Sequence, residues 1–131
     1  MNNDIISLKL PSKPEYVMVA RLASAAVANR MNFDIDQIED IKMAVAEAII
    51  LLINQISNPE QILIKLFVES KGIRIEILGE GLWKDGDLSL EDNNQTKMGR
   101  YILSYIMDKT EFNIDKGLLR AIYMYKEVGG Q

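Results

Sequence analysis

Glu47 is the residue whose type and setting most suggest chemistry, because it is the single charged residue of the run AVAEAIILLINQ, residues 44–55. The next polar residue in that run is Asn54. A carboxylate held among apolar neighbours can act as a general base toward a nucleophile bound beside it. The alternative is a former catalytic acid that now makes a structural hydrogen bond or faces solvent. The sequence therefore offers one carboxylate for acid–base work and leaves its use open.

The absence of two residue types limits that chemistry further. The chain contains no histidine and no cysteine. Ser-His-Asp and Cys-His catalysis, zinc sites built on histidine or cysteine, and haem or iron–sulfur ligation are thereby excluded. Disulfides are excluded as well, which agrees with a reducing compartment. We predict no metal site, and any catalysis would have to use carboxylates, lysine, arginine, tyrosine or serine.

Length and composition indicate an ordinary globular protein. The 131 residues are 48% apolar and 26% charged, and we expect one domain over 1–131. The formal net charge of -4 argues against a general affinity for nucleic acid or anionic membranes. The N-terminal residues lack the apolar core of a signal peptide, and no apolar run approaches the ~20 residues of a membrane helix. We therefore expect a cytoplasmic protein.

The elements that must position Glu47 follow from hydrophobic periodicity in the first half of the chain. Residues 6–10 alternate as a strand that stops at Pro11, and Ser12 is a candidate cap for a helix over 15–31. After a break, Asp34 or Asp36 can cap a second helix that carries Glu47 and is ended by residues 58–60. The apolar face predicted for the first helix is Tyr16, Val19, Ala20, Ala23, Val27 and Met31.

The second half alternates between strand and helix patterns. Two hairpins are predicted, with turns at Lys71-Gly72 and Lys116-Gly117, because apolar and polar residues alternate on both sides of each pair. Between them we expect a loop over residues 79–95 and a short helix over 98–108. The order of strands and helices predicts an α/β two-layer sandwich, with a mostly antiparallel sheet and helices on one face.

With Glu47 on the second helix, residues 10–48 (LPSKPEYVMVARLASAAVANRMNFDIDQIEDIKMAVAEA) resemble the bacterial anti-sigma factor and serine-protein kinase family. This family is part of the GHKL superfamily, which includes histidine kinases, Hsp90 and gyrase. The order of elements continues the resemblance to about Val128. It implies a Bergerat-type ATPase fold, with the catalytic glutamate at the position of Glu47.

The resemblance also implies an altered nucleotide site. Where the family has a magnesium-binding asparagine one turn after the glutamate, this chain has Leu51, which cannot ligate a hard cation. Gly79 replaces the aspartate that binds adenine, and Glu80 lies one residue out of register. Of the Gly-x-Gly that meets phosphate, Gly99 alone remains. We therefore expect a degenerate pocket at Gly79, Gly81 and Gly99, a vestigial Glu47, and no cofactor; ATP with Mg²⁺ belongs to the alternative of an active site.

A candidate partner surface lies on the first predicted helix. Arg21, Ser24, Ala25 and Ala28 recur at helical spacing, and small residues beside one arginine suit a docking face. The alternative is a close contact between helices, with the stem of Arg21 packed along it. The resemblance implies that an arginine at this place takes part in docking to partner proteins.

The loop expected at residues 79–95 has two interpretations. The resemblance implies a lid that closes on ATP, whereas the alternative is a surface loop. Trp83 in this loop is either folded onto the core or offered to a partner.

We thus expect a regulator of transcription by partner switching that binds a sigma factor, a STAS-type anti-anti-sigma protein, or both, and performs no ATP chemistry. The alternative is an active ATP-dependent serine kinase that phosphorylates a STAS-type partner. A third hypothesis is an inactive ATPase-like scaffold. A homodimer is left open, and neither nucleic acid nor membrane is expected as a direct partner.

Overall fold

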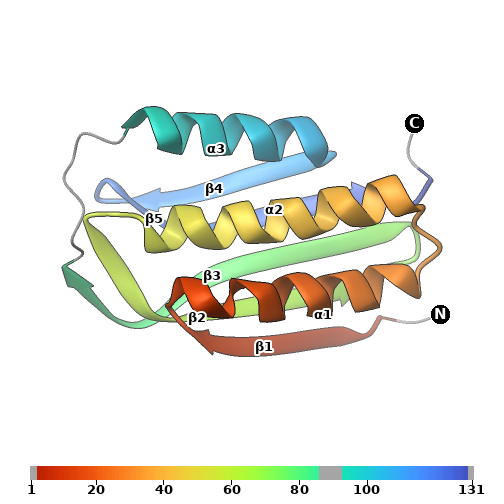
Figure 1. The fold of residues 1–131 in the computed structure, drawn as a ribbon, viewed down its shortest axis with the longest axis horizontal. Helices are drawn as coiled ribbons and strands as arrows, with labels where there is room; N and C mark the ends of the chain where they lie inside the picture. Colours follow the sequence, from red (N-terminus) through yellow and green to blue (C-terminus); the bar gives the residue numbers. More distant parts are fainter. Residues whose placement is uncertain (1–2, 86–92, 130–131) are drawn as a thin grey trace.

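One antiparallel sheet carries three helices on one of its faces in this computed structural model, which describes residues 3–85 and 93–129 (Figure 1). The strand order across the sheet is β1-β2-β3-β5-β4. The bounds of the strands are β1 Ile5–Pro11, β2 Ser57–Val68, β3 Gly72–Asp85, β4 Lys109–Asp115 and β5 Leu118–Glu127. The predicted two-layer α/β sandwich is confirmed.

One row of apolar residues crosses the whole sheet beneath the helices. In register, Leu8 pairs with Ile64, Ile64 with Ile77, and Ile77 with Ile122, which in turn pairs with Phe112. The three isoleucines are fully buried. Because successive side chains of a strand point to opposite faces, the alternation in the sequence turns these residues toward the helices. This row forms the floor of the core.

The helices are α1 Val17–Asn29, α2 Ile35–Ile53 and α3 Asn93–Ile106, with a short 3-10 turn, η1, at Pro14–Tyr16. Asp34 caps α2, as predicted: its carboxylate accepts from the Gln37 amide at 2.8 Å, and the Gln37 side chain accepts from the Asp34 amide at 3.2 Å. The prediction that Ser12 caps the first helix is wrong. The chain enters through η1, whose N-cap is Lys13 and has no side-chain hydrogen bond.

Two predicted boundaries are wrong because long-range pairing overrides the local signal. Residues 58–60 lie within β2, whereas α2 already ends at Ile53, where the Asn58 side chain donates to the Ile53 carbonyl at 3.0 Å. β3 continues to Asp85, so the first part of the predicted loop is strand. Residues 93–95 begin α3, and the rest of that loop, residues 86–92, lies outside the described part.

The face of α1 that packs inward agrees with the prediction at Ala20, Val27 and Met31 and differs from it elsewhere. Ala20, Ser24 and Ala28 are fully buried, whereas Tyr16 and Val19 are exposed. Small residues allow the backbones of two neighbouring helices to approach closely, and α1 lies beside α2 along its length (Figure 1). None of the described helices is long and apolar enough to cross a membrane.

Candidate functional site

Glu47 lies on α2 against the middle of α3, at Gly99. Its side chain is partly buried, and one turn later Leu51 is 6% exposed. A Cβ atom placed on Gly99 of α3 would lie 2.7 Å from Glu47 Oε2 and 2.8 Å from Leu51 Cδ2. The structure thus brings together Glu47, Leu51 and Gly99. Glycine at position 99 lets the α3 backbone rest directly on this part of α2.

Gly79 lies on β3, opposite Ile62 of β2, and its open side is filled by Trp83. A Cβ atom on Gly79 would lie 2.8 Å from Trp83 Cη2 and 2.9 Å from Pro59 Cβ. The indole packs against the buried core, so of the two interpretations of Trp83 the structure supports the folded one. Only a residue without a side chain fits beneath this indole.

Gly81 occupies a bulge that lets β3 continue past Gly79. Its φ of +81° is one that side chains rarely adopt, and the register of β2 and β3 shifts beside it, opposite Glu60. The Leu82 amide donates to Glu60 Oε1 at 3.4 Å. Glu80, which precedes the bulge, forms an ion pair with Lys9 of β1 at 3.1 Å. The backbone therefore requires glycine at position 81, and the Glu80 carboxylate is paired with Lys9, two strands away.

Two arginines at this end of the molecule lie on aromatic rings. The Arg120 guanidinium is 4.5 Å from the centroid of the Trp83 ring, and that of Arg100 is 5.4 Å from the centroid of Phe112. Both distances are within the range of cation–π attraction. Sequence reasoning missed Arg120, although an arginine inside the otherwise apolar strand LLRAIYMYKE was a signal for it. Trp83 is thus held by the core on one side and by Arg120 on the other.

These side chains do not fit ATP with Mg²⁺ in the way that the resemblance implies. Leu51 presents carbon where a hard cation would need oxygen. The space beside Gly79, where the family places an acidic side chain, holds the Trp83 indole. Within residues 3–85 and 93–129, no group of three acidic residues is arranged to hold a metal ion.

The predicted partner stripe on α1 is partly corrected. Ser24 and Ala28 are fully buried, and the Ser24 hydroxyl donates to the Ala20 carbonyl at 2.8 Å, so they cannot contact a partner directly. Arg21 and Ala25 are partly exposed. The exposed apolar side chains Met18, Val19 and Leu22 lie nearby on α1, and sequence reasoning missed them as surface residues. Their signal was large apolar residues at helical spacing in a helix otherwise rich in alanine.

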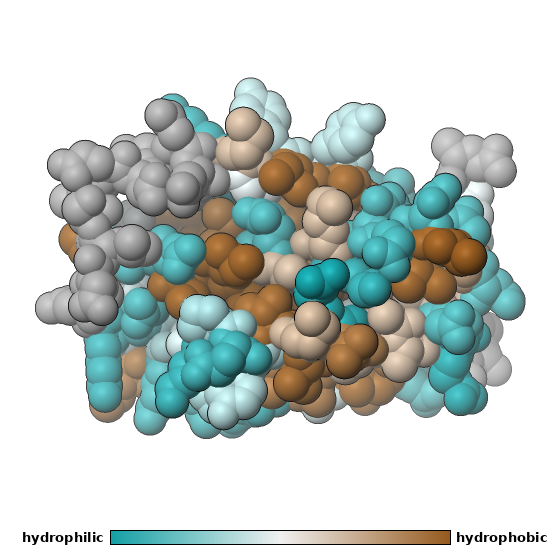
Figure 2. Space-filling view, viewed as in Figure 1, coloured by the Kyte–Doolittle hydropathy of each residue, from teal (hydrophilic) through white to brown (hydrophobic). Residues whose placement is uncertain are grey.

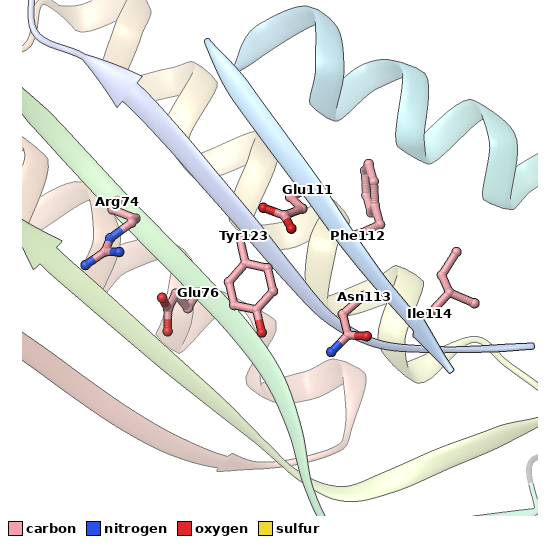
Figure 3. A pocket seen from close by; sticks show the side chains of 7 residues that line it. All are labelled: Arg74, Glu76, Glu111, Phe112, Asn113, Ile114 and Tyr123. Atoms are coloured by element: carbon pink, nitrogen blue, oxygen red, sulfur yellow. The ribbon is translucent and has the colours of Figure 1, made fainter. Parts of the chain in front are cut away.

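A polar hollow of about 580 Å³ lies on the sheet and includes no residue predicted for the site (Figure 3). Its charged members are Arg74, Glu76 and Glu111. Arg74 is engaged already, because it pairs with Glu69 at 3.2 Å and lies 4.2 Å from the centroid of the Phe67 ring. The side chains that line the hollow come from β3, β4 and β5.

Comparison with known proteins gives matches over most of the chain. Residues 10–126 match the family described as histidine kinase-like ATPase domain. A protein of Bacillus thuringiensis named serine-protein kinase RsbW is 30% identical over 138 residues, which cover 93% of this chain and 86% of that protein. The protein of the same name from Bacillus velezensis is 27% identical over 137 residues, with the same two shares.

A third relative matches a shorter segment more strongly. The protein named serine-protein kinase RsbW of Oceanobacillus iheyensis is 52% identical over 60 residues. That segment covers 46% of this chain and spans 38% of the length of the relative. The family match itself runs from the end of β1 to the end of β5, and so includes Glu47, Gly79 and Gly99.

Proposed function

Because this chain belongs to the histidine kinase-like ATPase domain family, we propose that it is an anti-sigma-factor-like regulator that works by partner switching. It binds a sigma factor, a STAS-type anti-anti-sigma protein, or both. Relatives that align over most of its length are named serine-protein kinase RsbW, which supports a regulatory role within this group. The regulator acts by sequestering one protein until another competes for it.

The proposal includes the loss of ATP chemistry, and one observation carries it. The Trp83 indole fills the space beside Gly79, where the resemblance places the side chain that recognises adenine. The indole therefore occupies the space that an acidic side chain at position 79 would need, and Leu51 removes the oxygen ligand for magnesium. The site would therefore lack both the side chain that recognises the base and the magnesium ligand that helps to hold the phosphates.

Calorimetric titration of the protein with ATP and Mg²⁺ tests this loss. We expect no saturable heat for the wild-type protein. The triple variant Leu51→Asn, Gly79→Asp, Trp83→Ala should gain measurable binding, because it restores two ligands and removes the indole that would collide with the new aspartate. The pair Leu51→Asn, Gly79→Asp is the matched control and should bind less than the triple variant. A submicromolar dissociation constant for the unmodified protein would overturn the proposal.

Arg21 is the residue that we assign to partner docking. It lies partly exposed on α1 beside Ala25, and a guanidinium can form several directional hydrogen bonds at the edge of a flat surface. Arg21→Ala should weaken binding to the sigma factor or STAS-type partner by about 1–3 kcal/mol. The melting temperature of the Arg21→Ala variant should be nearly that of the wild-type protein. Arg30→Ala, an exposed arginine at the end of α1, is the control and should leave binding intact.

The opposite result would place the interface elsewhere. A buried nitrogen of Arg21, Nε, shows that its stem lies partly within the protein. If the stem serves packing alone, Arg21→Ala would lower the melting temperature and keep full partner affinity. Surface plasmon resonance and thermal unfolding on the same variant separate the two roles.

The second candidate is an active serine kinase that phosphorylates a STAS-type partner. It is favoured by the retained Glu47, whose carboxylate lies beside Gly99, and by relatives that are named serine-protein kinases. Transfer of radiolabelled phosphate from ATP to a STAS-type protein tests it, with Glu47→Gln as the control for catalysis. We expect no phosphate transfer by the wild-type protein or by Glu47→Gln. Phosphate transfer by the wild-type protein that Glu47→Gln abolishes would establish the kinase.

A further inference from the structure

An apolar groove lies between α2 and α3, on the side of α2 away from α1 (Figure 1). It has a volume of about 490 Å³ and is lined by Met43, Tyr101, Ile102, Tyr105 and Ile106. Apolar side chains are visible across the helical face of the molecule (Figure 2). None of these five lining residues belongs to the sites assigned above, so the inference goes beyond the proposed function.

Three side chains of the groove are largely exposed to solvent although they are apolar or aromatic. Tyr101 and Tyr105 are 75% and 90% exposed, and Met43 across the groove is 51% exposed. The two tyrosines are four residues apart and therefore share one face of α3. Tyrosine offers a large contact area with few rotatable bonds, and methionine adapts to irregular apolar surfaces. Together they form a surface suited to an apolar partner.

Acidic residues border the groove along α2. Glu39 and Glu47 are each one turn from Met43, and Asp36 is one turn before Glu39. The Glu39 side chain is 60% exposed and forms an ion pair with Lys42 of the same helix, at 3.1 Å. The α2 border is therefore acidic from its first turn to the position of Glu47.

The α3 border adds one acid and one base at opposite ends. Asp108 follows Tyr105 by three residues, while Lys97 precedes Tyr101 by four. Lys126 contacts both Asp40 of α2 and Ile106 of α3, so the end of α3 near Tyr105 lies beside the start of α2. Asp36 and Glu39 of α2, and Asp108, which follows α3, thus lie toward the Tyr105 end of the groove; of the bases near them, Lys126 is only 8% exposed and Lys42 pairs with Glu39.

We propose that this groove binds an amphipathic helix of another protein, with apolar side chains along one face and lysine or arginine beside them toward the Tyr105 end. An apolar stripe at helical spacing fits between two helices, and basic side chains complement the acidic border. A second copy of this chain is disfavoured, because a two-fold contact through the groove would bring the two acidic borders together, on a chain of formal net charge -4.

Two synthetic peptides of about 18 residues, or roughly five helical turns, test the proposal. Both carry leucine at heptad spacing; one has lysine at the flanking positions and the other has glutamate there. Fluorescence anisotropy should show saturable binding of the lysine peptide, weakened by added salt, and no binding of the glutamate peptide. Equal binding of the two peptides would overturn the charge assignment and the proposal with it.

Variants then place the binding in the groove. Tyr105→Ala should weaken binding of the lysine peptide about tenfold, and Tyr101→Ala provides a second, independent variant should the first fail to fold. Leu22→Ala, an exposed apolar residue of α1, is the matched control and should leave binding unchanged. An unchanged affinity in both tyrosine variants would contradict the proposal. Sedimentation that shows a wild-type dimer, split into monomers by Tyr105→Ala, would assign the groove to a second copy instead and overturn it too.

Discussion

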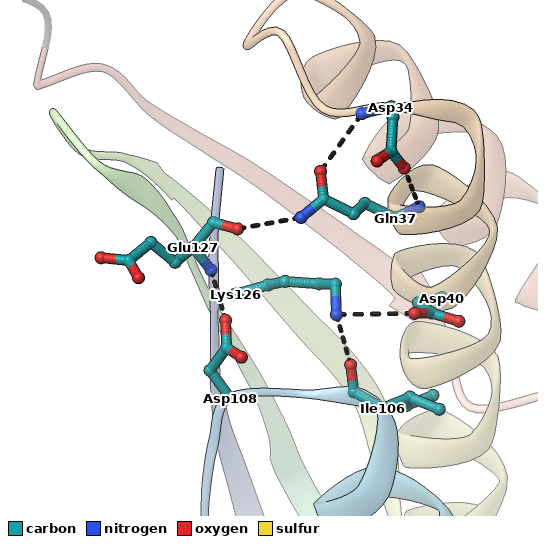
Figure 4. A network of polar contacts seen from close by, with 7 residues as sticks. All are labelled: Asp34, Gln37, Asp40, Ile106, Asp108, Lys126 and Glu127. Carbon is teal, nitrogen blue, oxygen red and sulfur yellow. Dashed lines mark hydrogen bonds and ion pairs between the residues drawn. The ribbon is translucent and has the colours of Figure 1, made fainter. Parts of the chain in front are cut away.

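The two ends of the helical layer are held together by different interactions. At the end where α2 begins and α3 stops, hydrogen bonds and an ion pair join the helices to β5 (Figure 4). At the opposite end, the contacts around Glu47, Gly79 and Gly99 are apolar and aromatic, and the Gln55 side chain after α2 exchanges two hydrogen bonds with the Leu119 backbone of β5, at 2.8 and 2.9 Å. Both ends connect the same helices to the same sheet, so the difference reflects what each end is built to hold.

The first end, which we call the polar clamp, consists of Gln37, Asp40, Asp108 and Lys126 with the backbone groups that they contact. Lys126 is only 8% exposed; its ammonium donates to the Ile106 carbonyl at 2.5 Å and pairs with Asp40 at 3.5 Å. Asp108 accepts from the Glu127 amide at 2.7 Å, and Gln37 donates to the Glu127 carbonyl at 3.2 Å. The polar groups of this end thus find partners within the chain.

At the other end, glycines and large side chains pack closely, in addition to the hydrogen bonds of Gln55. Gly79 lies beneath Trp83, Trp83 beneath Arg120, and Gly99 against Leu51. Close packing of this kind leaves little room for a ligand beside Gly79. The comparison teaches that an end which in the resembled family serves a ligand can be filled with side chains, while a single glutamine still joins the helix to the sheet there.

The largest effect should come from the polar clamp. Lys126→Met should lower the free energy of unfolding by about 3 kcal/mol, since it leaves Asp40 and the Ile106 carbonyl without their buried partner. Chemical denaturation monitored by circular dichroism measures this loss. Lys71→Met, at an exposed turn, is the control and should change stability by less than about 0.5 kcal/mol. Equal values for the two variants would show that the clamp contributes nothing.

The next effect concerns the filled end. Gly79→Ala should cost about 2 kcal/mol, because the added methyl group collides with Trp83 and Pro59. In a Trp83→Ala background the same substitution should cost less than about 1 kcal/mol, which a double-mutant cycle measures as coupling. Additive costs would mean that the indole does not occupy this space in solution.

A smaller effect is expected from the cap of α2. Asp34→Ala should cost about 1 kcal/mol, because the Gln37 amide loses its acceptor and the Gln37 side chain loses its fixed position. Asp36→Ala is the control in the same turn and should cost only about 0.3–0.5 kcal/mol through the helix dipole. Thermal unfolding distinguishes the two; a larger loss for Asp36 would contradict the capping role.

The smallest effect is the response of the polar clamp end to alkaline pH. Burial, followed by the charges of Glu127, Glu69 and Asp108, raises the pKa of Tyr125 above its ordinary value of 10.0. As the pH rises through about 10, the unfolded chain loses the phenolic proton before the folded protein does, so the stability of the fold decreases. Well below pH 10 the tyrosine is protonated in both states and contributes no pH dependence. Tyr125→Phe should therefore lose less stability than wild type between about pH 9 and pH 11. Identical losses would contradict the shift.

Much of the fold was predictable because its signals are local. Alternation over β2 and β3 predicted a hairpin, and in the second hairpin the positive φ angles at Lys116 and Gly117 match the turn chosen from sequence. The cap of α2 was narrowed to Asp34 or Asp36, because a capping side chain bonds an amide only three residues away, as Asp34 does. Likewise, Leu51 changes the chemistry of its position whatever surrounds it.

The faces of the helices were less predictable, because periodicity finds several stripes and does not say which of them meets a neighbour. On α1 the stripe of Ala20, Ser24 and Ala28 faces inward, since small residues let the backbones of α1 and α2 approach. The more apolar Val19 and Leu22 face outward. Hydrophobicity wrongly favoured Val19 for the inward face, and the preference for small residues in a docking face placed the buried Ser24 and Ala28 in the predicted partner stripe.

The sequence by itself determined the order of strands and helices, the apolar side chain of Leu51 one turn after Glu47, and the absence of histidine and cysteine chemistry, because each depends on residue type or on neighbours within a few positions. Only the tertiary structure decided that β3 runs on through Trp83, that this indole fills the space beside Gly79, and that Lys126 joins α2 to α3. These contacts join residues that are distant in sequence or turned together by a bulge. Their energy depends on packing and pairing in three dimensions, which no local pattern records.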